Sequence, residues 1–411
     1  MSRNPRERVL RTIRGEPADC VPAAPFMYDL AAVAAGVPLR EYYTRAEALV
    51  HAQLTLHELV GHDVISVGSD NYYIAEGFGC ETTRSDDELP ALEQPAVGQL
   101  ADVFSLDVPD PHTQGRMPMM IQAIRDVRRA VGDSVAIRCP GTGPFALASY
   151  LIGTQNWLLE VGMVEAGMSD SQEAALHRGL ELAAEALIRF GIACWEAGAD
   201  IIQCGDSLAS CNVISPRTYR RFAWPYQQKV FRAWRQRGIR ASLLHICGDS
   251  SRVLDWYAET GADLIEIDNQ VDLSYAAQRI GGRATLVGNV HTVTELLEGS
   301  RETVRAAAER CARDRARGCR TLSVRRSRRS LYFGLRLFGP PPHATGQRSR
   351  TGRSCSPLPP GPRPRVTIVR ASWPLRRLVQ VIEVRQIDPF VQGDAVCLVE
   401  RHPLFLQIGG R

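Results

Sequence analysis

The sequence predicts an α/β protein built as a (β/α)₈ barrel, and two observations support this. Short β-rich runs alternate with amphipathic helical patterns, the order expected of a parallel sheet covered by helices. Eight such runs can be counted: VPAAP (21–25), DVISV (63–67), VAIR (135–138), DIIQC (200–204), SLLHI (242–246), LIEID (264–268), TLVG (285–288) and CRTLSV (319–324). Because an open, doubly wound sheet gives the same alternation, the count favours the barrel without excluding that fold.

Three long amphipathic segments are the clearest predicted helices. They span residues 172–198, 215–238 and 300–318, and each ends at or near glycine, which often follows the last turn of a helix. Each lies shortly before one of the β-rich runs. Strand and helix therefore alternate as the crossovers of a parallel sheet require.

The composition bounds the class of protein. The 411 residues are 45% hydrophobic, yet no apolar run is long enough to span a membrane. The basic start, MSRNPRERVLRTIRGEP, has no apolar segment behind it, so we expect no signal peptide and no membrane partner. Eleven cysteines without a tight spacing pattern fit reduced thiols. The expected location is the cytoplasm.

The charge divides the chain into a predicted barrel, residues 1–324, and an Arg/Pro-rich tail, residues 325–411. Residues 315–411 hold 19 arginines and four acidic residues, whereas residues 1–314 hold 30 basic and 41 acidic ones. No helical or strand period can be followed through 339–365, so the last helix of the barrel is expected to be replaced by an irregular basic tail. Clustered arginine attracts phosphate, but the tail lacks interleaved aromatics, and we expect no nucleic-acid partner.

Two interpretations of this tail stay open. One is a disordered or weakly structured basic segment. The other is translation in a shifted reading frame, because a single lysine against 48 arginines points to a GC-rich coding sequence. Out-of-frame translation of such a sequence produces Arg, Pro, Gly and Ser.

The stretch LLHICGDSS, residues 243–251, brings a histidine and a cysteine to the end of an apolar run. Side chains at i and i+2 leave the same face of a strand, so His245 and Cys247 point together. Gly248 ends the strand, and Asp249 or Ser250 can cap a following helix. Imidazole and thiolate are ligands that zinc prefers, so the pair is a candidate metal site. Spacing alone favours a pair of packed core residues, and the family resemblance described next is what makes His245 and Cys247 the predicted metal ligands.

Several blocks, in order, resemble the uroporphyrinogen decarboxylase (URO-D) superfamily, and within it the corrinoid-dependent zinc methyltransferases of the methylcobamide:coenzyme M type. They are NPRERVLRTIRGEPADCVPAAP, AEGFGCETTRSDDELPALEQP, GTGPFALASYLIGTQNWL, EAGADIIQCGDSLASCNVISPRTYRRFAWPYQQKV, LLHICGDSSRVLDWYAETGADLIEID and LVGNVHTVTELLEGSRETV. The resemblance covers about residues 4–324. It implies a (β/α)₈ barrel whose site lies at the carboxyl ends of the strands.

The resemblance separates two activities. Decarboxylases of tetrapyrrole side chains carry an arginine-rich stretch after the first strand, whereas this chain has FMYDLAAVAAG there and no arginine between Arg14 and Arg40. The methyltransferase branch carries His-x-Cys, which HICG matches. That branch implies zinc as cofactor, a methylcorrinoid on a partner corrinoid protein as co-substrate, and a small-molecule thiol as acceptor. The alternatives are cofactor-free decarboxylation of a uroporphyrinogen-type tetrapyrrole in porphyrin biosynthesis, and a non-catalytic binding protein.

A zinc site needs a third protein ligand, and the resemblance implies a cysteine in a Gly-Cys-x-x-Pro segment after the eighth strand. Here RRSRRSLYFG follows that strand, and the cysteine is missing. A shifted frame would explain both the missing ligand and the basic tail. Cys204, Cys319 and Cys355 are the candidate substitutes.

Six further residues at strand ends are predicted to serve the site. Asp70 matches the position of the superfamily's catalytic aspartate, and Asp206 aligns with an acidic position often found there; both are predicted catalytic residues. Helix capping is the alternative for Asp70, and metal or substrate binding is open to either carboxylate. The predicted substrate-binding residues are Tyr72, Asp268, Asn289 and His291, with packing as the alternative for Tyr72 and turn hydrogen bonding for Asn289.

Overall fold

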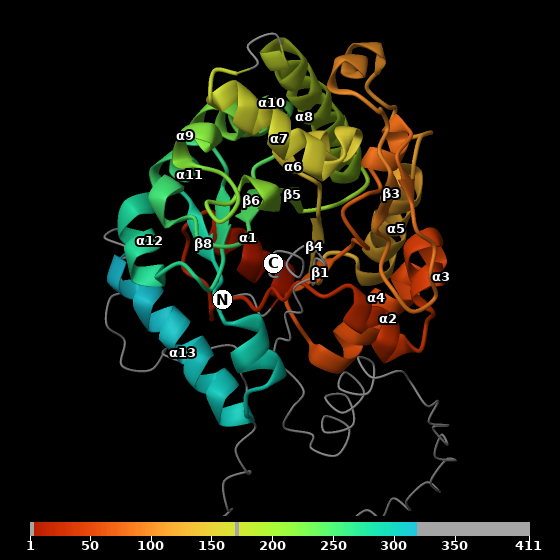
Figure 1. Ribbon diagram of the computed structural model, residues 1–411. Helices are drawn as coiled ribbons and strands as arrows, with labels where there is room; N and C mark the ends of the chain where they lie inside the picture. Colours follow the sequence, from red (N-terminus) through yellow and green to blue (C-terminus); the bar gives the residue numbers. More distant parts are fainter. Residues whose placement is uncertain (1–3, 169–171, 319–411) are drawn as a thin grey trace, which may run out of the picture.

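A computed structural model describes residues 4–168 and 172–318 of the chain (Figure 1). Its central element is a six-stranded parallel sheet with the order β1-β4-β5-β6-β7-β8. The strands are β1 (Val64–Ser66), β4 (Ala136–Cys139), β5 (Ile201–Gly205), β6 (Ser242–Ile246), β7 (Leu264–Ile267) and β8 (Thr285–Val287). They curl around a common centre, as the strands of a (β/α)₈ barrel do. A separate antiparallel pair, β2 (Glu81–Thr82) and β3 (Leu92–Gln94), lies outside this sheet.

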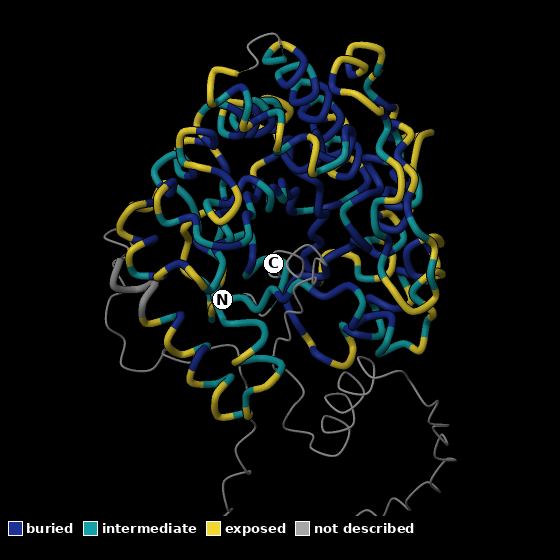
Figure 2. The backbone as a smooth tube through the Cα atoms, in the orientation of Figure 1, coloured by how far each residue is buried: buried dark blue, intermediate teal, exposed yellow. Residues whose placement is uncertain are grey.

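Helices surround the sheet, most of them on its convex side (Figure 1). Along the chain they are α1 (Pro5–Ile13), α2 (Asp29–Ala35), α3 (Leu39–Thr44), α4 (Ala46–Val60), α5 (Met117–Val131), α6 (Pro144–Ile152), α7 (Thr154–Glu165), α8 (Glu173–Glu196), α9 (Pro216–Thr218), α10 (Trp224–Arg237), α11 (Leu254–Glu259), α12 (Leu273–Ile280) and α13 (Arg301–Gly318). Figure 2 shows buried residues toward the centre and exposed residues on the outer faces of the helices. The predicted helices at 172–198, 215–238 and 300–318 are therefore present, the second interrupted by a π-turn at Tyr219–Ala223.

Strand register gives the sheet two chemically different faces. His245 pairs laterally with Gly205 and Glu266, while Cys204 pairs with Leu244. Laterally paired residues share a face and neighbours along a strand alternate, so His245 and Glu266 face the concave side. Cys204 faces the helices on the opposite side.

Helix α1 packs against the start of the sheet. Its Asn4 side chain accepts a hydrogen bond from Glu7 N and caps the helix, and Val9 joins a buried cluster with Val64, Ile201 and Leu243. This small cluster fills the interior at the amino ends of the strands. Members of this cluster also line a cavity that reaches the residues following the strands at their carboxyl ends.

Six of the eight predicted strands are present, and the prediction of a strand at 21–25 was wrong. Pro22 and Pro25 lack an N–H, so this segment cannot form a regular ladder. One backbone hydrogen bond, from Asp63 N to Ala23 O at 2.8 Å, and one from Ala23 N to the Asp63 carboxylate at 2.7 Å hold it beside β1. The predicted strand at 319–324 and the tail, 325–411, lie outside the described residues.

Candidate active site

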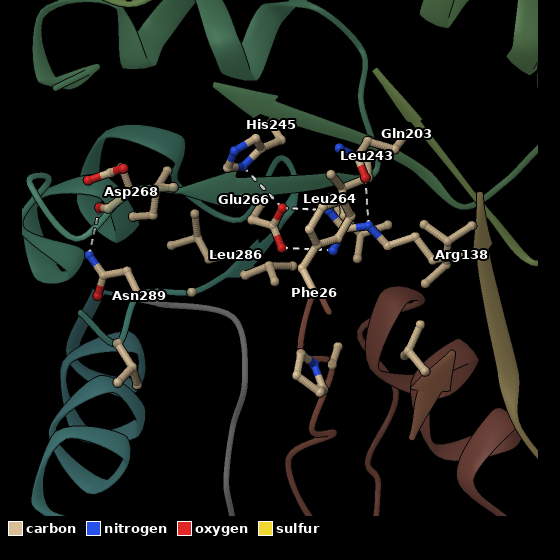
Figure 3. A pocket seen from close by; sticks show the side chains of 18 of the residues that line it. Phe26, Arg138, Gln203, Leu243, His245, Leu264, Glu266, Asp268, Leu286 and Asn289 are labelled. Carbon is tan, nitrogen blue, oxygen red and sulfur yellow. Dashed lines mark hydrogen bonds and ion pairs between the residues drawn. The ribbon is translucent and has the colours of Figure 1, made fainter. Parts of the chain in front are cut away.

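The concave face of the sheet borders a cavity of about 400 Å³. Its wall consists of inward-facing strand positions and of residues that follow the strands. Figure 3 shows the polar members of this wall, with aliphatic side chains around them. Those that matter for chemistry are Arg138, Gln203, Ser207, His245, Cys247, Glu266, Asp268 and Asn289.

His245 and Cys247 form a close pair at the carboxyl end of β6. The Nε2 atom of His245 lies 3.1 Å from the sulfur of Cys247. The hydroxyl of Ser207, which follows β5, donates to the same sulfur at 3.1 Å. Both side chains are half-buried and line the cavity. The structure thus brings together the two residues that the sequence predicts as metal ligands.

Glu266 lies behind this pair. One of its carboxylate oxygens, Oε2, lies 3.0 Å from Nδ1 of His245. Arg138 donates two hydrogen bonds to the same carboxylate, at 2.9 and 2.6 Å, and a third to Gln203 Oε1 at 2.7 Å. The Arg138 guanidinium also lies 4.5 Å from the centre of the Phe26 ring. A bidentate arginine therefore fixes the carboxylate that orients the histidine.

The curl of the sheet makes this contact possible. Arg138 is on β4 and Glu266 is on β7, with β5 and β6 between them. In a flat sheet, strands three steps apart would be separated by roughly 14 Å. Their side chains meet because the sheet wraps around the cavity, and the pair bridges its concave face (Figure 3).

The charges of these groups shift one another's pKa values. Burial lowers the pKa of His245, but the Cys247 sulfur and the Glu266 carboxylate outweigh it and raise that pKa to about 10. Burial raises the pKa of Cys247, yet His245 and Ser207 together bring it below its ordinary value. Glu266 is held well below its usual pKa, because Arg138 and His245 overcome the effect of burial. Cys247 is therefore biased toward the thiolate, the form that binds metal and reacts.

The two donor atoms, an imidazole nitrogen and a thiolate sulfur, are of the types that zinc binds. Imidazole nitrogen and thiolate sulfur on one tetrahedral zinc lie roughly 3.5 Å apart, a little more than the 3.1 Å seen between His245 Nε2 and Cys247 Sγ. Within residues 4–168 and 172–318, no group of three or more His, Cys, Asp or Glu is arranged to hold a metal. Cys204 is no candidate third ligand, because it is fully buried on the helix-facing side of β5. Cys319 and Cys355 lie outside the described residues.

Asp268 and Asn289 also line the cavity. Asp268 follows β7, and its carboxylate accepts a hydrogen bond from Gln270 N at 2.9 Å. The amide of Asn289 donates to the backbone oxygens of Asp268 and Val271, at 3.0 and 2.7 Å. Asn289 thereby holds the loop that presents Asp268. Both residues line the cavity, and their predicted substrate-binding roles stay predictions.

Comparison with known proteins identifies the family of this chain. The sequence matches the uroporphyrinogen decarboxylase (URO-D) family over residues 4–321. The chain belongs to the uroporphyrinogen decarboxylase family.

Two kinds of relatives of this URO-D family member are similar to it. One is the methylcobamide:CoM methyltransferase MtbA of Methanosarcina mazei, 29% identical over 74% of this chain and 88% of that protein. Another is the uroporphyrinogen decarboxylase of Xanthomonas axonopodis pv. citri, 31% identical over 73% of this chain and 85% of that protein. A solved methyltransferase from Methanosarcina mazei, 27% identical, superimposes with a TM-score of 0.68 over 76% of this chain and 90% of its own. The (β/α)₈ fold of the URO-D family is thus shown for this chain.

Asp70 lies outside the cavity wall in this URO-D barrel. It is buried, and Arg116 donates to both of its oxygens, at 2.6 and 2.8 Å. Ser69 Oγ and Tyr72 N donate to the same carboxylate at 2.7 and 2.8 Å. Tyr72 packs its ring 4.8 Å from that of Tyr150. In this arrangement Asp70 and Tyr72 stabilise the segment after β1, and their predicted catalytic and substrate-binding roles stay predictions.

Asp206 and His291 likewise lie outside the cavity wall. Asp206 accepts hydrogen bonds from Ala146 N at 2.8 Å, Phe145 N at 3.3 Å and Gln227 Nε2 at 2.8 Å. The first two are unpaired donors of the first turn of α6, so Asp206 caps that helix from another strand. His291 Nδ1 accepts from the backbone N–H of residues 293 and 294 and caps the turn that follows. Their catalytic and substrate-binding roles also remain predictions.

Four residues of the site were not predicted from the sequence: Arg138, Gln203, Glu266 and Ser207. The first three each interrupt an apolar strand, in VAIR, DIIQC and LIEID, whereas Ser207 follows β5. Inward positions alternate along a strand, so Gln203 shares a face with Ile201, and Glu266 with Leu264. A polar residue at such a position requires a buried partner, and this signal was present in the sequence.

Cys80, Cys139, Cys194 and Cys204 are buried free thiols, and no disulfide links them. Among the described helices, none has the length and apolar character needed to cross a membrane.

Proposed function

We propose that this chain transfers a methyl group from a methylated corrinoid protein to a small-molecule thiol activated by zinc, with His245 and Cys247 among the zinc ligands. The observation that supports this most is the orientation of the two donors. Nε2 and Sγ lie 3.1 Å apart at the end of β6 and line the cavity, while Nδ1 is held from behind by Glu266. This is how a metal-binding histidine is usually oriented.

The residues of the chain supply binding, orientation and charge. When bound, zinc would lower the pKa of the acceptor thiol, so that the thiolate predominates near neutral pH. The thiolate sulfur attacks the methyl carbon, and the cobalt–carbon bond breaks with its electron pair left on cobalt as Co(I). The thiol proton leaves to solvent, and the product is a thioether. Leu243, Leu264 and Leu286 give the deeper part of the cavity an apolar lining.

The charge of the cavity supports methyl transfer over the alternative, decarboxylation of a uroporphyrinogen-type tetrapyrrole. Such a substrate carries several carboxylates and needs cationic groups to bind them. Among the described residues that line the cavity, Arg138 is the sole arginine or lysine, and its guanidinium is committed to Glu266 and Gln203. A zinc-free protein that decarboxylates a porphyrinogen would overturn our proposal.

The test uses the full chain, stripped of metal and then titrated with Zn²⁺ against a chromophoric chelator. We expect one equivalent of zinc to bind, and the absorbance of methylcobalamin to fall when a thiol is added to the zinc-loaded protein. His245→Ala and Cys247→Ser should weaken zinc binding by more than about 100-fold, because loss of an orienting partner alone costs about 10- to 100-fold. Cys211→Ser is the matched control, because Cys211 is another half-buried thiol that does not line the cavity. Equal zinc affinity in Cys247→Ser and Cys211→Ser would refute the assignment of the ligands.

The third ligand is tested at the level of the gene. We propose that the reading frame shifts near the codon for Val324, in which case resequencing would restore a Gly-Cys-x-x-Pro segment. The corrected chain should then bind zinc more tightly than the 411-residue chain. A confirmed sequence with no such segment would leave Cys319 and Cys355 as the candidates.

A further inference from the structure

We infer that the acceptor thiol of this chain carries no negative charge, that it binds best when it bears an ammonium group, and that Asp268 is the residue that selects it. The inference rests on the proposed function, because it takes the acceptor to bind in the cavity beside His245 and Cys247. It names the class of acceptor from the charges of the cavity wall.

The positive charge of the wall is already neutralised. Arg138 is buried, and its three donating nitrogens bind Glu266 and Gln203 while its guanidinium stacks on Phe26. No other arginine or lysine lines the cavity among the residues that the structure describes. Among the described residues, an anionic acceptor would therefore find no uncommitted arginine or lysine in the cavity wall.

The negative charge of the wall is not neutralised. Asp268 and Asp29 both line the cavity, and their carboxylates accept backbone hydrogen bonds, from Gln270 N at 2.9 Å and Leu30 N at 3.0 Å. Neither makes an ion pair with a cationic side chain in the described part of the chain. Both are half-buried. A carboxylate in such a position favours a cationic ligand and opposes an anionic one.

Asp268 is the better placed of the two to act on the acceptor. It follows β7, whereas Cys247 follows the adjacent strand β6, and parallel neighbours end at the same rim. Figure 3 shows the Asn289 amide bonded to the backbone oxygen of Asp268, which fixes the position of this residue in the cavity wall. An ammonium group two carbons from a sulfur at Cys247 would be directed toward it.

The test compares three thiols of equal length: 2-aminoethanethiol, 2-mercaptoethanol and 2-mercaptoethanesulfonate. Their dissociation constants for the full chain are measured by ligand-detected NMR, with and without added Zn²⁺, and their kcat/KM values with methylcobalamin as donor. Asp268→Asn removes the charge without changing the volume. Asp126→Asn makes the same change on the surface of α5, where the side chain pairs with Arg129.

We expect 2-aminoethanethiol to bind at least about tenfold more tightly than the sulfonate, the neutral thiol to fall between, and Asp268→Asn to reduce this ratio severalfold. Asp126→Asn should leave the ratio unchanged. Comparing ratios between variants cancels the intrinsic reactivity of each thiol. Tighter binding of the sulfonate, a ratio unaffected by Asp268→Asn, or no binding of any of the three would overturn the inference.

The experiment distinguishes failure of the proposed function from failure of the proposed charge selection. Binding in the expected order without methyl transfer would support the selection by charge and overturn the proposed function. Methyl transfer that prefers the sulfonate would support the function and overturn the selection.

Discussion

The Nδ1 atom of His245 lies 3.0 Å from Oε2 of Glu266, and this contact determines which edge of the imidazole faces Cys247. The carboxylate is itself fixed by two hydrogen bonds from Arg138. Orientation of the histidine therefore depends on a residue three strands away. This relationship gives the first of the predictions below.

Replacing Glu266 by glutamine should weaken both the fold and the metal site. The change leaves the buried Arg138 without its counter-charge, and we expect the free energy of unfolding in urea to fall by about 3 kcal/mol. The affinity for zinc should fall about 10- to 100-fold, because the histidine loses its orienting partner. Glu259→Gln, the same change at an exposed position on α11, should alter neither quantity. Unchanged zinc affinity in Glu266→Gln would refute the orienting role.

Cys247 should react with iodoacetamide at lower pH than Cys211 does in the metal-free protein. His245 lowers the pKa of Cys247, whereas burial raises the pKa of Cys211. The thiolate is the reacting form, so a lower pKa moves the rise of the rate with pH toward acid. Peptide mapping by mass spectrometry at a series of pH values measures both sites in one sample. In His245→Ala the profile of Cys247 should move toward alkaline pH, and a profile that does not move would contradict the coupling.

Asp70→Asn should destabilise the protein strongly. Arg116 is buried and donates to both oxygens of Asp70, so the variant leaves a buried charge with a weaker partner. We expect a loss of about 3 kcal/mol in chemical denaturation. The exposed Asp87→Asn serves as control.

The stabilisation by Asp70 should depend on pH. Burial raises the pKa of Asp70, but Arg116 and the other hydrogen-bond donors to its carboxylate together have the larger, opposite effect, so the pKa lies below its ordinary value. Its contribution is therefore present above the unfolded pKa near 4 and is lost only as the pH falls through the lower folded value.

A buried histidine pair should make the fold sensitive to mild acid. The rings of His57 and His62 lie 5.0 Å apart, and burial lowers the pKa of both, that of His62 to about 3. Below pH 6.5 the unfolded chain binds protons that the folded chain does not, so stability falls as the pH decreases. His62→Phe removes one of these protons and should flatten the decline between pH 6 and 4 by up to about 1.4 kcal/mol per pH unit.

The exposed His112→Phe is the control for this measurement, since its ring is already in contact with solvent. It should leave the slope of unfolding free energy against pH unchanged. An equal slope in wild type and His62→Phe would show that His62 takes up its proton in the folded state.

Gly248→Ala should disturb the loop that carries Cys247. Gly248 has a φ of +80°, and an added Cβ would lie 2.5 Å from Asn212 Oδ1 and 2.6 Å from Ser210 Oγ. We expect a loss of about 2 kcal/mol in stability together with weaker zinc binding. Gly281→Ala has a similar φ of +61° but meets only one atom, at 3.7 Å. Gly281→Ala therefore measures the cost of backbone strain without the steric clash. Equal zinc affinity in Gly248→Ala and Gly281→Ala would show that the loop after Cys247 does not position this ligand.

Much of this fold could be predicted from the sequence because parallel strands are apolar and regularly spaced. Six runs, from DVISV to TLVG, coincide with strands, and the pair His245 and Cys247 lies at the end of one of them as its spacing predicts. The predicted strand at 21–25 is absent because two of its five residues are prolines. Proline has no backbone N–H to donate to a neighbouring strand. The family resemblance is confirmed by the match over residues 4–321.

The contacts across the barrel could not be predicted from the sequence alone. Arg138 and Glu266 are 128 residues apart, and only the curl of the sheet makes them partners. Asp70 and Asp206 stand at strand ends, where both catalytic and structural carboxylates occur, and spacing does not tell which way each side chain turns. The salt bridge to Arg116 and the cap on α6 are long-range contacts of this kind.

The bridge from Arg138 to Glu266 also limits how the barrel can be redesigned. It crosses the cavity between the rim, where His245 and Cys247 lie, and the apolar residues at the amino ends of the strands, which line the same cavity. A deeper pocket for a bulkier acceptor would require replacing Arg138, Gln203 and Glu266 at the same time, each by an apolar residue of similar volume. Removing only one of them would leave a buried charge or amide without its partner. Such a triple replacement would also let the His245 ring rotate. The larger pocket would therefore come with a less well oriented metal ligand.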